Sequence, residues 1–246
     1  MNNDSRFCSL KCAAIAIAVF TVLSATTHVS YAQKNVHGGL NFMIGIPKGE
    51  FSENVENIGL GGSLFAGYHL PDSPLTIGAN IGFLIYGRDT RRERFSLTIP
   101  DAMVVVTNSN NIVLAHFLLR LQPESGKVLP YFDSLIGFNY LFTDTSIRGE
   151  RDYEEIATST NFSDFAFSYG LGGGIKIKVY EPRNSDTFKK GPSAVFIDFC
   201  ARYLLGTEAE YLKKGSIQRV NGEAYYDVSK SKTDILLINI GVSVGF

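Results

Sequence analysis

The chain has 246 residues, and 23 lysines and arginines balance 24 aspartates and glutamates to a formal net charge of −1. This balance argues against a basic nucleic-acid-binding face, and we expect no nucleic-acid partner. The mean hydropathy of +0.05 argues against a bundle of membrane-spanning helices, but it is compatible with strands in which only alternate residues are apolar.

Residues 1–32 have the pattern of a cleavable secretory signal peptide. Two basic residues precede an apolar run at 13–23, which is shorter than the roughly 20 residues a spanning helix needs. Small residues at Ser30 and Ala32 lie at minus three and minus one of the expected cut. We therefore predict export to the periplasm and one mature domain, 33–246.

The mature sequence contains eight segments with a period of two, in which bulky apolar side chains alternate with small or polar ones. Each is about 11 residues long, the length that a tilted strand needs to cross a bilayer. The segments cover residues 36–46, 59–70, 75–86, 112–122, 131–142, 165–179, 195–206 and 234–246.

This pattern predicts an all-β fold, an eight-stranded antiparallel up-and-down transmembrane β-barrel. A soluble lipocalin-like ligand-binding barrel has the same period with its bulky face inward. An eight-stranded barrel is only just wide enough inside for side chains, so the Phe, Tyr, Leu and Ile face would overfill it. We assign that face to lipid and the Gly, Ser and Asn face to the lumen.

A ten-stranded barrel is the alternative, if Phe95–Ile99 and Met103–Thr107 are counted as strands. Each is too short to span a bilayer. We interpret them as extensions of the third and fourth strands above the membrane.

The links between segments alternate in length. The even links are mostly short and the odd links mostly long, with long links at 87–111, 143–164 and 207–233. Outer membrane barrels have short periplasmic turns and long outer loops. The alternation places both termini on the periplasmic side, although the sixth link, 181–193, is longer than this rule predicts.

Charged residues on the small, polar face form one candidate site. They are Arg120, Asp133, Lys176, Lys178, Asp198 and Arg202. An unpaired charge in a narrow lumen is costly, whereas a paired and hydrogen-bonded one is tolerated. We predict a charge network that plugs the lumen; the alternative is an ion or proton path.

Four arginines at the outer end of the third segment form a second candidate site: Arg88, Arg91, Arg92 and Arg94. Guanidinium groups bind phosphate through paired hydrogen bonds, so this cluster could contact lipopolysaccharide. The alternative is a solvated loop in which the arginines pair with Asp89 and Glu93.

The histidines argue against catalysis at the outer rim. His28 lies in the predicted signal peptide, and His37, His69 and His116 lie in predicted strands. A Ser-His-Asp triad in an outer loop would have no base. We predict no enzymatic activity, cofactor or metal. A metal shared by His37 and His69 is the alternative, but no third ligand is suitably spaced.

The end of the chain carries a short pattern of its own. Ile240, Val242, Val244 and Phe246 share one face of the last segment. A terminal Phe after alternating apolar residues resembles the signal by which the barrel assembly machinery handles bacterial outer membrane barrels. We expect deletion of Phe246 to reduce insertion.

Together these features resemble the bacterial outer membrane β-barrel family related to the membrane domain of outer membrane protein A. The stretches that carry the likeness are Ile46-Pro47-Lys-Gly49-Glu-Phe51, Leu119-Arg120-Leu121, Pro130-Tyr131, Gly137-Phe138-Asn139-Tyr140, Ala201-Arg202-Tyr203-Leu204-Leu205-Gly206 and Phe246. The resemblance implies a place in the outer membrane among its lipid and lipopolysaccharide. It implies architecture rather than activity. The chain ends at the last predicted strand, so we expect no peptidoglycan-binding domain.

The sequence thus predicts a non-enzymatic outer membrane barrel whose long outer loops act as a surface-contact or structural element. A small outer membrane channel or transporter is the alternative. The sequence names no external partner.

Overall fold

A computed structural model describes residues 35–94, 103–149, 155–181, 194–220 and 223–245. The predicted signal peptide, the segment Phe95–Ile99 and the terminal Phe246 lie outside these residues.

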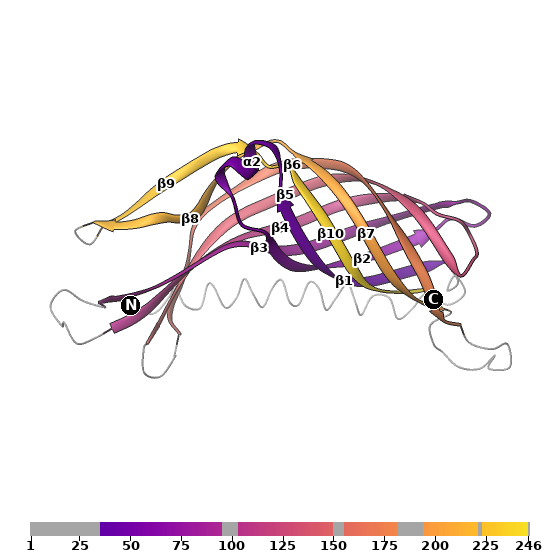
Figure 1. Ribbon diagram of the computed structural model, residues 1–246, viewed down its shortest axis with the longest axis horizontal. Coiled ribbons are helices and arrows are strands. Elements are labelled where there is room, and N and C mark those ends of the chain that lie inside the picture. The colour runs from indigo at the N-terminus through magenta and orange to yellow at the C-terminus, as the bar shows by residue number, and fades with distance from the viewer. Residues whose placement is uncertain (1–34, 95–102, 150–154, 182–193, 221–222, 246) are drawn as a thin grey trace, which may run out of the picture. The chain divides into compact units, whose positions relative to one another are not determined.

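Eight strands close into a barrel in the order β1-β10-β7-β6-β5-β4-β3-β2, and Figure 1 shows this barrel from the side. Every neighbouring pair is antiparallel. The barrel strands are β1 (Val36–Pro47), β2 (Gly59–His69), β3 (Leu75–Arg94), β4 (Met103–Leu121), β5 (Val128–Gly149), β6 (Glu155–Tyr180), β7 (Ala194–Gly206) and β10 (Ile235–Gly245). The predicted eight-stranded antiparallel barrel is confirmed, and the ten-stranded alternative is wrong.

The bulky apolar face of the strands points outward. Phe117 is 74% exposed, Leu64 57% and Ile136 53%, and each lies on a different strand. Side chains of this size exposed all around a barrel require an apolar surrounding. The soluble lipocalin-like alternative is therefore wrong, because its bulky face would be buried inside.

The inside of the barrel is more apolar than the sequence analysis predicted. One buried cluster contains Met43, Phe65, Leu84, Ile112, Leu114, Leu118, Leu135, Leu141, Leu204 and Leu237. Several of these residues break the period of two by placing an apolar side chain on the polar face. The lumen is therefore partly filled by a hydrophobic core as well as by polar groups.

Two long links of the sequence analysis are mostly strand. β3 and β4 continue beyond the barrel's outer end to Arg94 and from Met103, as predicted for Met103–Thr107. β5 and β6 continue in the same way, to Gly149 and from Glu155, where a loop was predicted. We call these continuations the outer extension: residues 86–94, 103–111, 142–149 and 155–164.

Cross-strand side-chain bonds explain why the outer extension is ordered. Thr143 Oγ1 donates to Asn110 Oδ1 at 2.9 Å, and Thr145 Oγ1 donates to Asn108 Oδ1 at 2.7 Å. Such pairs between directly opposite residues stabilise a sheet. The sequence of this region is polar, and a polar composition alone does not show whether a segment forms a hydrogen-bonded strand pair or a loop.

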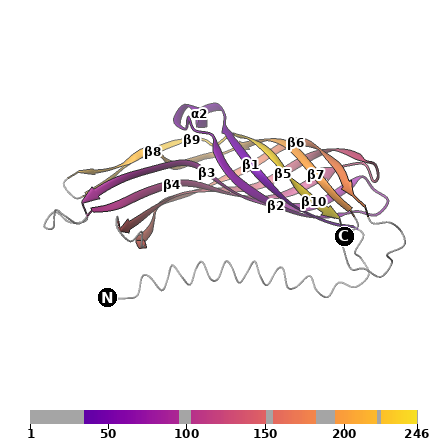
Figure 2. The same ribbon diagram turned by 60° about the horizontal axis from the view of Figure 1, so that its bottom comes forward.

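The last long link, 207–233, is also structured. It contains β8 (Glu208–Val220) and β9 (Glu223–Lys232), which form a separate two-stranded sheet. A register shift between Leu212 and Ile217 interrupts the alternation that would have predicted them. Both views show this hairpin at the same end of the barrel as α2 (Gly49–Asn54), which follows β1 (Figures 1 and 2). No helix in the described part of the chain is long and apolar enough to span a membrane.

The outward face of β5 offers a test of the lipid contact. Ile136 pairs with Phe117 on one side and Tyr169 on the other, in the middle of the barrel wall. Ile136→Arg should lower the free energy of unfolding by about 2 to 4 kcal/mol, because a charge near the bilayer midplane is poorly solvated. Urea unfolding in lipid vesicles measures this loss.

The matched control is Ile156→Arg, because Ile156 is also about half exposed (50%) but lies in the outer extension. That variant should unfold like the unmodified protein. Equal losses at both positions would contradict the assignment of Ile136 to lipid.

Candidate functional site: the lumen and the outer mouth

A carboxylate held between two arginines is the centre of the lumen's charge network. Arg120 Nε and Nη2 donate to Asp133 Oδ1 and Oδ2 at 2.7 and 3.0 Å. Arg202 Nε and Nη2 both donate to Asp133 Oδ2, at 3.1 and 2.9 Å. None of the three side chains is more than 3% exposed. Asp133 therefore joins β4, β5 and β7 across the inside of the barrel.

Aromatic rings enclose the Arg120 guanidinium. Its central carbon lies 3.7 Å from the ring centre of Tyr131 and 4.6 Å from that of Phe65. These are cation–π contacts, which are stronger where water is excluded. Phe65 is one of the apolar residues buried on the inner face, and its contact with Arg120 explains why an aromatic side chain lies there.

Two further polar contacts extend the network. Tyr131 Oη donates to Asp198 Oδ1 at 2.6 Å, and Arg202 Nη1 donates to Asn80 Oδ1 at 3.0 Å. Arg202 has room because Gly172 lies opposite it: a Cβ at this glycine would come within 2.5 Å of Arg202 Cγ.

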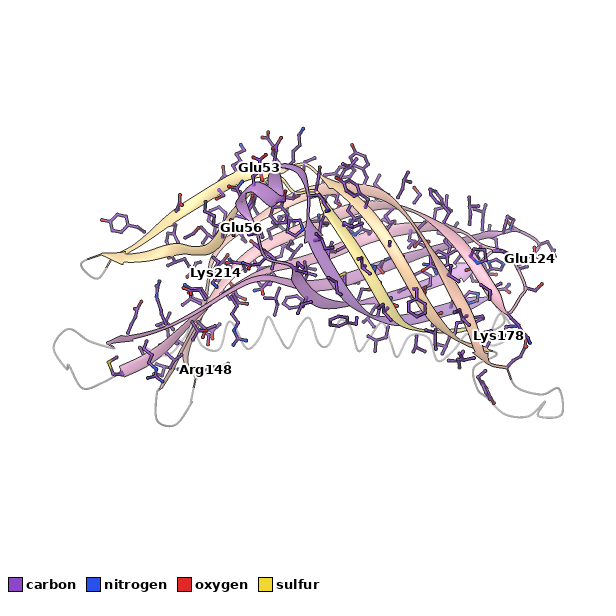
Figure 3. The ribbon with its side chains drawn as sticks, in the orientation of Figure 1. Glu53, Glu56, Glu124, Arg148, Lys178 and Lys214 are labelled. Carbon is purple, nitrogen blue, oxygen red and sulfur yellow. The ribbon has the colours of Figure 1, made fainter. Side chains whose placement is uncertain are left out.

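The two predicted lysines have different positions. Lys176 is buried, and its Nζ donates to Gln122 Oε1 at 3.2 Å. Lys178 instead pairs with Glu181 at 3.1 Å, and Figure 3 labels it at the same end of the barrel as Glu124. Its inclusion in the lumen network was wrong. β6 ends at Tyr180, so the Lys178 ammonium reaches the solvated end of the barrel.

The Asp133 carboxylate is surrounded by cationic donors. Asp133 accepts four N–H donors from two guanidinium groups. A carboxylate with its acceptor sites filled by permanent cations is held ionised and has little capacity to take a proton. The arrangement connects strands that are distant in sequence.

The histidines lie in the barrel wall and face inward. His37, at the start of β1, and His69, at the end of β2, have ring centres 5.9 Å apart, and His69 Nδ1 is 2.9 Å from Thr76 Oγ1. His116 and Cys200 are buried. Among the described residues, no three His, Cys, Asp or Glu side chains are placed to hold a metal ion.

The outer mouth of the barrel is occupied by aromatic side chains that the sequence analysis did not bring together. Phe51 of α2 packs edge-on against Tyr211 of β8, with ring centres 5.0 Å apart, and also contacts Tyr86 of β3 at 5.8 Å. Burial raises the pKa of Tyr211, whose hydroxyl lies 2.7 Å from Ser231 Oγ. We call Phe51, Tyr86 and Tyr211 the mouth cluster.

Hydrogen bonds hold the β8–β9 hairpin against β3. Tyr86 Oη donates to the Leu212 carbonyl at 3.0 Å, and Arg91 Nη1 donates to the Ile217 carbonyl at 2.6 Å. Backbone carbonyls of a hairpin that are bound by side chains of another strand fix its position. These contacts could not be predicted from the sequence. The register shift in β8 interrupts the alternation of apolar and polar residues that would have shown which of its side chains face inward.

A bulge in β3 divides the four arginines. The register shifts between Ile85 and Gly87, so Tyr86 and Gly87 are both buried and the alternation then reverses. Arg88 and Arg92 are exposed, as contact with an external phosphate requires. Arg91 is turned the other way and pairs with Glu93 at 2.5 Å. The side chain of Arg94 lies outside the described residues. The other three arginines do not form one phosphate site, because Arg91 faces away from Arg88 and Arg92.

The predicted assembly signal lies along the barrel seam. Ile240 and Val242 are 46% and 49% exposed on the outer face of β10, where they pair with Phe42 and Leu40 of β1. Val244 is half-buried, and Phe246 lies outside the described residues. Recognition of these residues by the assembly machinery stays a prediction.

The geometry is that of a lipid-facing barrel, and a sequence profile of the outer membrane protein beta-barrel domain matches residues 15–181, more than half of the chain. The chain belongs to the outer membrane β-barrel family. Its location is accordingly the bacterial outer membrane.

Two solved structures are similar to this family member. Neisserial surface protein A (NspA) has 11% identity and a TM-score of 0.40, with 86% of this chain and 96% of that chain covered. A major outer membrane protein from Thermus thermophilus has 12% identity and a TM-score of 0.42, with 86% and 99% covered. No curated protein matches the sequence at a significant level.

The shared carboxylate can be tested by an isosteric change. Asp133→Asn leaves Arg120 and Arg202 buried without their counter-charge, and breaking such a network costs about 3 to 5 kcal/mol. Unfolding of this outer membrane barrel in urea can be followed by its heat-modifiable gel mobility. The urea concentration at the midpoint of unfolding should be lower for this variant. Asp227→Asn, at an exposed position of β9, is the control and should leave the midpoint unchanged. If the Asp133→Asn variant is as stable as the unmodified protein, the network does not stabilise the barrel.

Proposed function

We propose that the protein is a non-enzymatic outer membrane barrel with a closed lumen, whose outer extension and β8–β9 hairpin form a surface-contact or structural element. The observation that carries this proposal is the attachment of the hairpin to the barrel mouth through Tyr86 and Arg91. A hairpin held by these bonds and by the mouth cluster presents a fixed outer surface.

The filling of the lumen supports closure. The charge network around Asp133 lies on the periplasmic side of Leu118 and Leu135, which are directly paired on β4 and β5. Both leucines belong to the buried apolar cluster. An ion passing through the barrel would meet salt-bridged side chains and then an apolar layer, and both oppose its passage.

The outer surface offers contact area for a partner. Tyr226 and Val228 of β9 are 44% and 40% exposed, and Ile156 of β6 is 50% exposed. Aromatic and aliphatic side chains of this kind supply most of the energy of protein contacts. Because the neighbouring ladders fix the backbone, these side chains are presented without a large ordering cost.

A narrow water or proton path is a second candidate function. His116 Nε2, Asn139 Oδ1 and both amide atoms of Asn239 are buried without a protein hydrogen-bond partner among the described residues. Buried polar atoms of this kind usually bind water. Water bound to these atoms would support slow proton movement rather than passage of solutes.

Conductance separates the two candidates. Purified protein in planar bilayers should show no large, stable open state, since eight strands leave little free cross-section and side chains occupy it. Asp133→Asn should destabilise the barrel without creating a selective pore. A steady porin-sized current from the unmodified protein would overturn the closed-lumen proposal, and a small current carried by protons alone would favour the second candidate.

The proposed orientation predicts which thiols are accessible on intact cells. Asp227→Cys in the hairpin should react with a membrane-impermeant maleimide, because β9 lies outside the cell in this proposal. Glu124→Cys, in the β4–β5 turn at the opposite end in Figure 3, should react only after the outer membrane is permeabilised. Buried Cys200 should contribute little background. If only Glu124→Cys is labelled on intact cells, the barrel has the opposite orientation to the one proposed.

A further inference from the structure

A groove of about 310 Å³ opens at the outer rim of the barrel, where β2 begins. This volume is at the lower end of the roughly 300 to 1,000 Å³ of small-ligand sites. The groove is lined by Asn57, Ile58, Leu60, Ile85, Tyr86, Gly87, Arg88 and Lys214. These residues come from the α2–β2 link, from β2 and β3, and from the bend of β8.

The floor of the groove is continuous with the lipid-facing wall. Leu60 and Ile85 are directly paired across β2 and β3 and are 54% and 37% exposed. Ile58, just before β2, is 58% exposed. The same outward face carries the bulky apolar side chains farther down both strands, so the floor borders on acyl chains rather than on bulk water.

Two cations lie at the upper edge of this apolar floor. Arg88 is the first outward-facing residue after the β3 bulge, and Lys214 lies beside Gly215 in the bend of β8. Both side chains are exposed, and Figure 3 labels Lys214 beneath the β8–β9 hairpin. Among the described residues, the groove lining includes these two cations and no carboxylate.

We propose that the groove binds one molecule of lipopolysaccharide, with a lipid A phosphate between Arg88 and Lys214 and an acyl chain along Ile58, Leu60 and Ile85. A guanidinium group and an ammonium group complement a phosphate. The apolar floor directly below them complements the acyl chains that lipid A carries close to its phosphates. The site goes beyond the surface role proposed above, and it uses one of the four arginines that the sequence analysis selected.

The position of the groove selects this lipid over other phosphates. Free phosphate would leave the apolar floor without a partner. The groove lies at the end of the barrel that carries α2 and the hairpin, opposite the short turns, and in this orientation it meets the outer leaflet. Because Lys214 belongs to β8 and the floor to β2 and β3, a bound lipid would also connect the hairpin to the barrel wall.

The test measures retention of lipid by the purified, folded barrel. The protein is refolded in neutral detergent and titrated with diphosphoryl lipid A, with dephosphorylated lipid A and with inorganic phosphate. Native mass spectrometry counts the bound lipids. Diphosphoryl lipid A should bind at least about tenfold more tightly than the dephosphorylated form, which corresponds to the loss of charge-assisted hydrogen bonds. Inorganic phosphate should not compete.

Two pairs of variants locate the site. Arg88→Gln with Lys214→Gln should weaken binding about tenfold or more, whereas Lys127→Gln, in the β4–β5 turn at the other end, should bind normally. Ile58→Ser should weaken binding, whereas Val128→Ser, at an equally exposed position of β5 (54% against 58%), should not. Heat-modifiable mobility shows that each variant is folded.

Three results would overturn the proposal. The first is unchanged affinity in the folded Arg88→Gln, Lys214→Gln variant. The second is an equal loss in Lys127→Gln, which would indicate attraction by net charge alone. The third is equal binding of dephosphorylated lipid A. Each of these leaves the closed-lumen proposal intact, because conductance is measured separately.

Discussion

The width of an eight-stranded barrel is the constraint on which the rest of this structure depends. Its interior has room for side chains but little else. Each inward position must therefore hold either a glycine or a side chain that fits among its neighbours. Gly172 and Arg202 illustrate the rule, since the strand facing the arginine has no side chain at that point. The outward positions are free of this limit and carry the large aromatic and aliphatic residues that lipid accepts.

The lumen contains two different layers of side chains, one charged and one apolar. Toward the β4–β5 turn, Asp133 lies between Arg120 and Arg202, so the buried charges are paired with one another and Arg120 also contacts aromatic rings. On the outer side, paired leucines such as Leu118 and Leu135 exclude water. Burying an ion pair stabilises little by itself, but removing one partner is costly. The network therefore specifies which strands lie together, while the apolar layer supplies ordinary hydrophobic stabilisation.

The sequence was sufficient for the eight strands, their faces and most of the lumen network, because a wall between lipid and a narrow lumen imposes a strict period of two. Outside the membrane that constraint ends. The extension at Met103–Thr107 was predicted, but the strand that carries Thr143 beyond the membrane and the hairpin after Gly206 were expected to be loops. The bulge at Tyr86 could not be seen either, since one extra residue changes no composition yet turns Arg91 away from Arg88. Lys178 was wrongly assigned to the lumen network. The period of two shows which face of a strand a residue lies on, but not how far along the barrel axis its side chain lies.

The attachment of α2 to the hairpin has a consequence for the way the ring closes. β1 and β10 form the seam where the two ends of the barrel sheet meet. α2 directly follows β1, and β9 directly precedes β10. The Lys232 amide donates to Glu50 Oε2 at 3.2 Å, and the Lys48 amide donates to the Asp234 carbonyl at 2.9 Å. The Lys48 bond extends the β1–β10 ladder by one residue, and the Glu50 bond adds a contact between α2 and β9 that lies outside this ladder. Lateral opening of the barrel between β1 and β10 would have to break these two hydrogen bonds as well as the strand ladder, so they add resistance to opening at this joint.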